Sequence, residues 1–238
     1  SNGCYFFLLV CRTTIALINA SFVFGMPNFI AANFPDSPKK LRTWLYAAFI
    51  VTGPFIGGKI GAKLTKKVGG YESKWSFIII LVADLCVAGC VYPLTFLADW
   101  RIFILNFYGY LIFANSVLPS LVGIITTSVP VNIKPKAAAL ANLMTTTFGG
   151  FLAPLVFGTV NANHAETDKR YVMKFMVGYA LAGFIALIIA TILRFTKKDE
   201  EKKEEKKPVE DVQLKDVKDE EQMDKEEKDD EFQPKVKL

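Results

Sequence analysis

Six long apolar stretches fill most of the first 196 residues and constrain the fold of this chain more than any other feature. Each reaches or exceeds the roughly 20 residues that a helix, rising about 1.5 Å per residue, needs to cross a hydrocarbon core about 30 Å thick. Strands of a membrane barrel would be about 9 to 11 residues long and would alternate apolar with polar side chains, a pattern absent here. The sequence therefore predicts an all-α, multi-pass membrane protein. We expect the spans at residues 5–31, 44–64, 75–97, 102–129, 137–160 and 171–195.

The charged residues divide the chain into two unlike regions near Thr196. Residues 1–196 hold 16 Lys and Arg against 6 Asp and Glu, whereas residues 197–238 hold 12 against 17. The basic residues of the first region lie in short loops at the ends of spans, which is typical of topology signals and not of a nucleic-acid-binding face. The second region has too little apolar surface to offset the entropy of ordering it. We predict a six-span bundle over 1–196 and a charged, disordered tail over 197–238, which either binds a partner or only solvates the end of the chain.

Aromatic and basic residues mark the ends of the spans, as expected at the headgroup level of a bilayer. The aromatic residues are Trp44, Trp75, Trp100 and Tyr171. One side of the membrane collects Lys63, Lys66, Lys67, Lys74, Lys134, Lys136, Arg194, Lys197 and Lys198, and the other collects Lys39, Lys40, Arg42, Arg101, Lys169 and Arg170. The positive-inside bias makes the first side cytoplasmic. We therefore expect a multi-pass protein of the plasma membrane or of an endolysosomal membrane, with both ends of this chain in the cytoplasm.

The end of the second span carries a glycine followed by a cationic cluster. Gly58, Lys63, Lys66 and Lys67 resemble, at the right spacing, the cytoplasmic loop motif of the major facilitator superfamily. Ala62 stands where that family has Asp, and Thr65 stands where it has Gly. The motif follows the second helix of the family and, in weaker form, the eighth of its twelve helices. The departures resemble the weaker form, so a gating role is not assigned to this loop.

The rest of the chain is similar to the same family. A short link at residues 130–136 precedes a span with Gly149, Gly150, Pro154 and Gly158, which looks like the family's eleventh helix. The first span, with its exit at residues 24–27, and the fifth span are together most similar to Spinster-like lipid transporters, with the organic anion transporters next. The resemblance implies that the six spans are helices seven to twelve and that the chain looks like a fragment lacking an N-terminal six-helix half.

The resemblance also implies a function and partners. The chain would be the C-terminal half of a secondary active transporter, not an enzyme, which moves an amphipathic or organic solute, such as a lysolipid or sphingolipid-like compound, by alternating access. Its partners would be the lipid bilayer, the small-molecule or lipid substrate and the missing half. We expect no cofactor, no metal and no nucleic acid.

Two charged residues within the apolar spans are candidates for function, because a charge inside a bilayer is costly unless it meets a partner or a cavity. Arg12 lies about seven residues into the first span, so it either lines a cavity or extends to the nearby membrane surface. Asp84 lies about nine residues into the third span, roughly 13 Å deep and therefore near the midplane. Asp84 is either a proton-coupling group or a neutral, hydrogen-bonded structural residue.

Neutral polar residues on shared helix faces are the candidates for a substrate pathway. Arg12 and Asn19 share a face of the first span. In the same way, Asn106 and Tyr110 share a face of the fourth span, and Asn142 and Thr146 share a face of the fifth. The fourth span also holds Pro119, which leaves a carbonyl group free for another donor. Each residue could instead form an ordinary hydrogen bond between helices. The full set is Arg12, Asn19, Asn106, Tyr110, Asn115, Ser116, Asn142 and Thr146.

Six spans also occur in three other classes of membrane protein: channel subunits, intramembrane hydrolases and scaffolds. A channel subunit would need a span with repeated Arg or Lys, or a carbonyl filter loop, and the sequence has neither. An intramembrane hydrolase would need a Ser beside a His, or paired carboxylates, within the membrane. The single histidine, His164, is expected in a loop, and Asp84 has no acidic companion in any span. A six-span scaffold or anchor that presents the charged tail remains the alternative to a transporter.

Overall fold

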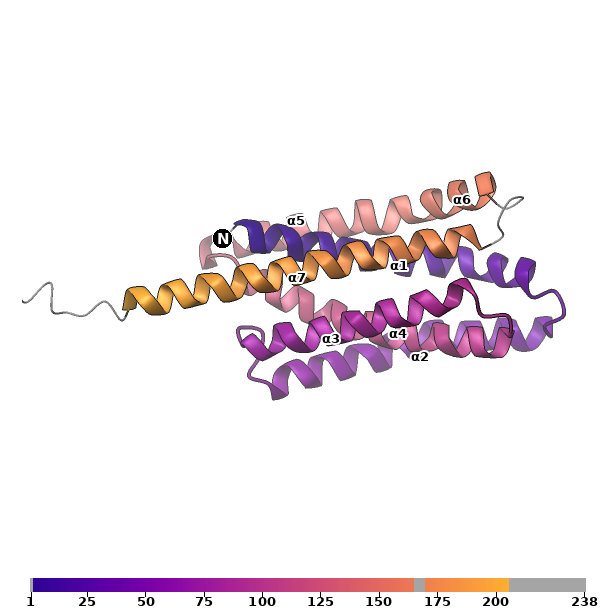
Figure 1. Cartoon of the computed structure of the whole chain (residues 1–238), viewed down its shortest axis with the longest axis horizontal. Coiled ribbons are helices and arrows are strands. Elements are labelled where there is room, and N and C mark those ends of the chain that lie inside the picture. The colour runs from indigo at the N-terminus through magenta and orange to yellow at the C-terminus, as the bar shows by residue number, and fades with distance from the viewer. Residues whose placement is uncertain (1, 165–169, 206–238) are drawn as a thin grey trace, which may run out of the picture. The chain divides into compact units, whose positions relative to one another are not determined.

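The structure is a computed structural model that describes residues 2–164 and 170–205. Every regular element among these residues is helical (Figure 1). Six helical segments are long and apolar enough to cross a membrane, which confirms the predicted all-α class with six such segments. The predicted spans differ from the observed ones by a few residues at their ends. The observed spans are Gly3–Asn33, Lys39–Lys67, Lys74–Thr95, Trp100–Thr127, Val131–Asn163 and Tyr171–Thr196.

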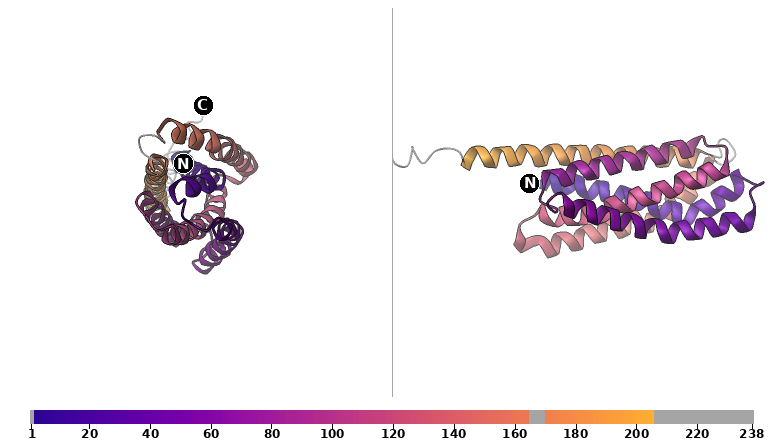
Figure 2. Two further views of the ribbon diagram at one scale, coloured as in Figure 1. Left: turned by 90° about the vertical axis from the view of Figure 1, so that its right-hand side faces the viewer. Right: turned by 90° about the horizontal axis from the view of Figure 1, so that it is seen from below.

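The spans run side by side and reverse direction at each loop (Figures 1 and 2). Side chains at two loops set where helices begin. Ser73 accepts a hydrogen bond from the backbone N–H of Trp75, and Asp99 accepts one from that of Arg101, so both cap a helix N-terminus. The elements are α1 (Asn2–Asn33), α2 (Lys39–Lys67), α3 (Lys74–Val91), η1 (Tyr92–Thr95), α4 (Trp100–Thr127), η2 (Val131–Ile133), α5 (Lys134–Met144), η3 (Thr145–Phe151), α6 (Leu152–His164) and α7 (Tyr171–Glu205).

The fifth span is not one regular α-helix. Between α5 and α6 the seven residues of η3 form a π-helix, which is wider than an α-helix. Gly149 of η3 lies directly on α1, where an added Cβ would come within 2.7 Å of the Ala16 methyl group. The absence of a side chain at Gly149 therefore permits the close contact between η3 and α1. His164, expected in a loop, is the last residue of α6.

A close helix contact joins α2 to α4 through a stripe of small residues. Gly53, Gly57, Gly61 and Thr65 follow each other at intervals of four, so they lie on one face of α2, and all four are buried. An added Cβ would overlap the carbonyl oxygen of Ile112 at Gly57 and that of Ser116 at Gly61. Thr65 completes the stripe with a hydrogen bond of 2.8 Å between its hydroxyl and that of Ser120. Small residues permit such close approach of helices within a membrane.

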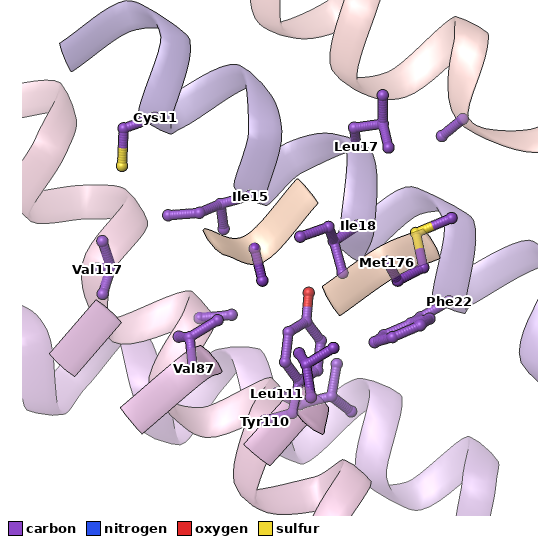
Figure 3. Packing of buried hydrophobic residues seen from close by; sticks show 14 of the residues in the cluster. Cys11, Ile15, Leu17, Ile18, Phe22, Val87, Tyr110, Leu111, Val117 and Met176 are labelled. Carbon is purple, nitrogen blue, oxygen red and sulfur yellow. The ribbon is translucent and has the colours of Figure 1, made fainter. Parts of the chain in front are cut away.

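Aromatic side chains fill the contact between α1 and α4. The Phe22 ring meets the Tyr110 ring edge-on, with 4.9 Å between the ring centroids, and it meets the Phe107 ring similarly. Figure 3 shows the Tyr110 ring among Ile18, Phe22 and Met176, with its hydroxyl directed toward α1. These side chains come from α1, α4 and α7, and the buried core also includes Phe77, Ile80, Val87 and Val91 of α3.

Several contacts between spans have a counterpart when the first three spans are exchanged with the last three, whereas the contacts of α3 with α2 and with α1 have none among the described contacts. Under this exchange, the contact between α2 and α4 corresponds to the contact between the fifth span and α1. The contact between α1 and α2 corresponds to the contact between α4 and α5. All four of these contacts occur. The contact of α3 with α4 becomes that of α7 with α1, where the Cys4 thiol donates to the carbonyl oxygen of Ala190. The contacts of α1 with α4 and of α3 with α7 map onto themselves.

Contacts within the chain separate Ser1–Phe195 from Thr196–Leu238. In the second part, α7 continues as a helix to Glu205, beyond the start of the predicted disordered tail at residue 197. The remainder of that predicted tail, residues 206–238, lies outside the described residues.

Candidate functional site

Arg12 and Asn142 form a polar contact between α1 and α5. The Arg12 guanidinium donates to the side-chain oxygen of Asn142 at 2.8 Å. Seven residues before Arg12, the Tyr5 hydroxyl donates to the backbone oxygen of Ala137 at 2.8 Å, so two hydrogen bonds tie this part of α1 to α5. Arg12 is partly buried, whereas Asn142 is exposed on the surface of the unit. A guanidinium has five N–H donors, and Asn142 takes one of them, which leaves donors available to an anionic or polar group.

A second polar contact joins α1 to α4 deeper in the unit. The Tyr110 hydroxyl donates to the side-chain oxygen of Asn19 at 2.8 Å. Tyr110 is fully buried, and Asn19 is partly buried. This bond satisfies a polar group that would otherwise be costly to bury. Asn19 and Tyr110 therefore form a hydrogen bond between helices, one of the two roles open to them from the sequence.

The other candidates on α4 do not join these two contacts. Asn106, four residues from Tyr110, donates instead to the backbone oxygen of Cys90 on α3. The Asn115 side chain donates to the Leu111 carbonyl oxygen of its own helix at 2.7 Å. Ser116 donates to Phe113, also in its own helix, and its backbone is the surface on which Gly61 packs. Asn106 and Ser116 thus connect α4 to neighbouring helices, and neither lies beside Arg12.

Thr146 lies one turn after Asn142, at the start of η3, and is exposed. The structure therefore brings Arg12, Asn142 and Thr146 to neighbouring positions on α1 and the fifth span. We call these three residues the α1–α5 polar face. Two of them are exposed in the six-span unit, so a solute or another protein segment can reach them.

Asp84 lies apart from the α1–α5 polar face. It is buried, with 3% of its surface exposed, and its side chain contacts the thiol of Cys11 on α1, with 3.9 Å from Sγ to Oδ2. Cys11 is also buried. The carboxyl group therefore sits where α3 packs against α1, while Arg12, the next residue after Cys11, bonds to Asn142 on another side of α1.

The residues of the cytoplasmic loop motif lie on the surface of α2. An added Cβ at Gly58 would meet no atom within 4 Å, and Lys63, Lys66 and Lys67 are exposed. One charged residue of this helix was overlooked in the sequence. Lys59 lies within the predicted second span, and its ammonium group sits 4.0 Å from the centre of the Phe55 ring, one turn earlier. Its position inside an apolar stretch was the signal that could have identified it.

Among the residues that the structure describes, no group of three or more His, Cys, Asp or Glu side chains could hold a metal ion. Comparisons of the chain with models of protein families, with curated proteins and with solved structures found no match. The function is therefore inferred from the contacts between the spans and from the polar residues themselves.

Proposed function

We propose that this chain supplies one half of a secondary active transporter of the major facilitator type, which moves an amphipathic or organic solute by alternating access. The observation that carries this proposal is that several contacts between spans have a counterpart when spans one to three are exchanged with spans four to six. Because three is odd, the second set of spans runs through the membrane in the opposite sense to the first. Inverted repeats of three helices are the building units of each six-helix half in this superfamily.

The exposure of individual spans supports a missing partner half. In α1 and α4, 50% of the residues in the most apolar 18-residue stretch are buried within the unit, whereas in α2 and in the fifth span only 17% of such residues are buried. These two least buried spans are exchanged with each other by the same pairing. Both therefore offer free surface for another bundle, and α2 also presents the open Gly58 there.

The α1–α5 polar face is the part of the substrate pathway that the geometry supports best. Arg12 is charged and lies inside the first apolar span, where an unpaired charge is costly. Its hydrogen-bonded partner among the described residues, Asn142, is neutral and exposed. A polar or anionic group of the transported solute would complete the hydrogen bonds of the guanidinium. The proposed orientation, with both ends of this chain in the cytoplasm, rests on the positive-inside bias.

The proposal is tested by water accessibility in the complete product of the parent gene. Thr146→Cys, in a background where the four native cysteines are replaced, should react with a membrane-impermeant thiol reagent, because this position would line an aqueous pathway. The matched control is Val82→Cys on α3, a position 55% exposed in the unit that would face lipid. Reaction at position 146 but not at position 82 supports the proposal. Equal reactivity at both positions, or a complete product with only these six spans, would overturn it and favour the scaffold.

A further inference from the structure

Lys59 carries a positive charge on the surface of α2, inside the second apolar span. It lies eight residues before Lys67, the last residue of α2, which is about 12 Å along the helix axis. The Lys59 side chain is exposed. Among the described residues, its ammonium group lies 4.0 Å from the centre of the Phe55 ring and contacts no carboxylate. A charge within a bilayer that has no such partner is costly.

The Lys59 side chain extends away from the nearer membrane surface. Lys63, Lys66 and Lys67 mark that surface, at the C-terminal end of α2. Phe55 lies one turn farther from this end than Lys59 does, so the ammonium group beside its ring is directed toward the middle of the span. This direction is usual, because the Cα–Cβ bonds of a helix tilt toward its N-terminus. The Lys59 charge therefore does not lie at the level of the lipid headgroups.

Lys59 lies on the face of α2 opposite to the face that packs on α4. Gly57 belongs to the packed face, where an added Cβ would overlap the carbonyl oxygen of Ile112. Phe55 and Lys59 are each two residues from Gly57, which corresponds to about 200° around the helix. On the opposite face, Val51 is 72% exposed and Phe55 is 63% exposed. This outer face of α2 is therefore apolar, has no neighbour within the unit and contains one cation.

A carboxylate is the group whose chemistry fits the surroundings of Lys59. The lysine ammonium has three N–H donors, and an aromatic ring attracts its charge without supplying an opposite one. Asp84, the acidic residue that lies inside a span among the described residues, is buried and contacts Cys11 instead. A phospholipid phosphate lies at headgroup level, whereas a transmembrane helix can carry a carboxylate at any depth. Charged side chains within membranes commonly pair with one another.

We propose that the outer face of α2 binds a transmembrane helix that carries an aspartate or a glutamate at the depth of Lys59, and that the two side chains form an ion pair. The inference rests on the proposed function for the source of this helix, which would be the missing six-span half. Helix contact would also cover Val51 and Phe55 and exclude water from the ion pair, which strengthens the attraction. A second copy of this chain does not fit, because a symmetric contact would bring two Lys59 side chains together.

Photo-crosslinking beside Lys59 tests the proposal in the complete product of the parent gene, in its native membrane. The photoreactive residue p-benzoylphenylalanine replaces Phe55, so that Lys59 is retained, and the cross-linked peptides and lipids are identified by mass spectrometry. We expect a cross-link to an apolar segment, long enough to span the membrane, that contains an Asp or a Glu. The control is the same residue at position 82 on α3, where Val82 is 55% exposed and would face lipid. Lipid adducts alone at position 55, or a cross-linked helix without an acidic residue, would overturn the proposal.

An exchange of charges then identifies the ion pair. Lys59→Glu should lower the midpoint of thermal unfolding of the complete product in detergent, because two carboxylates would then meet. Replacing the cross-linked acidic residue by lysine in the same variant should restore the midpoint. Lys63→Glu, one turn nearer to the end of α2, is the matched control, and the same second replacement should not restore it. Failure of the second replacement to restore Lys59→Glu, or equal restoration of both variants, would overturn the ion pair.

The result for this helix contact is separable from the result for the proposed function. A cross-link to an acidic helix of a different polypeptide would support the ion pair even if the complete product has only these six spans, an outcome that overturns the proposed transporter half. A complete product with a second six-span half, but with lipid adducts alone at position 55, would overturn the ion pair and leave the proposed function intact.

Discussion

Asn142 on α5 accepts a hydrogen bond of 2.8 Å from the guanidinium of Arg12 on α1. The contact places a neutral partner, not a carboxylate, beside a charge that lies within an apolar span. Among the described residues of the six-span unit, Asp84 is the one acidic residue inside a span, and its contact is with Cys11. Among the described residues, Arg12 therefore has a polar but uncharged group beside it and no carboxylate.

We expect Asn142→Ala to destabilise the unit by about 1 to 2 kcal/mol, because it removes a hydrogen bond to a charged group and leaves the guanidinium without its partner. The free energy of unfolding, measured by titrating a mild detergent with SDS, reports this change. Thr146→Ala, one turn away, serves as the control, because the Thr146 side chain is exposed and makes no hydrogen bond with the described residues. Equal stability of both variants would mean that the Arg12–Asn142 bond does not contribute.

Adjacent glycines of α2 should respond in opposite ways to the same substitution. Gly57→Ala places a methyl group against the carbonyl oxygen of Ile112, so we expect a loss of stability of about 1 to 3 kcal/mol. Gly58→Ala meets no atom within 4 Å and should be neutral or stabilising by up to about 1 kcal/mol, since Ala favours the helix over Gly. The same unfolding titration compares them. If Gly58→Ala were as damaging as Gly57→Ala, the observed packing of α2 on α4 would be wrong.

Features set by residues close together in the sequence were predictable, whereas features set by tertiary packing were not. The six spans were predictable because each apolar stretch alone is long enough to cross a membrane. The glycines of the second span are visible in the sequence, but their contact with α4 depends on tertiary packing. The π-helix was missed because a pattern of period 3.6 does not reveal an extra residue per turn. Its only local signs were the three successive threonines and the pair Gly149–Gly150.

The candidate site shows the same division. Residues four apart lie on one helix face, so Asn106 and Tyr110 were expected to act together. That face of α4 touches two neighbours, and Asn106 bonds to α3 while Tyr110 bonds to α1. Spacing within one helix thus predicts a shared face, but it does not predict which neighbouring helix each side chain reaches.

The Tyr110–Asn19 hydrogen bond should be measurable by a double-mutant cycle. Tyr110→Phe and Asn19→Ala each remove one partner, and the double variant removes both. We expect a coupling free energy of about 0.6 kcal/mol, the average for hydrogen bonds between membrane helices, with an upper bound of about 1.7 kcal/mol. A coupling indistinguishable from zero would show that the bond does not form in the membrane. Asn106→Ala, combined with Tyr110→Phe, provides the control, because these two side chains bond to different helices.

Asp84 offers a test of proton coupling in the complete transporter. The Asp84 carboxyl is buried between α3 and α1, and the titratable side chain in contact with it is the thiol of Cys11. Asp84→Asn keeps the size and hydrogen-bonding capacity of the group but can no longer gain or lose a proton. If Asp84 couples protons to transport, the variant should fold normally and lose the pH dependence of uptake in proteoliposomes. Cys11→Ser, which keeps a donor beside the carboxyl, should retain that dependence. Unchanged uptake and an unchanged pH profile in Asp84→Asn would remove this residue from the mechanism and leave it as a neutral contact between α3 and α1.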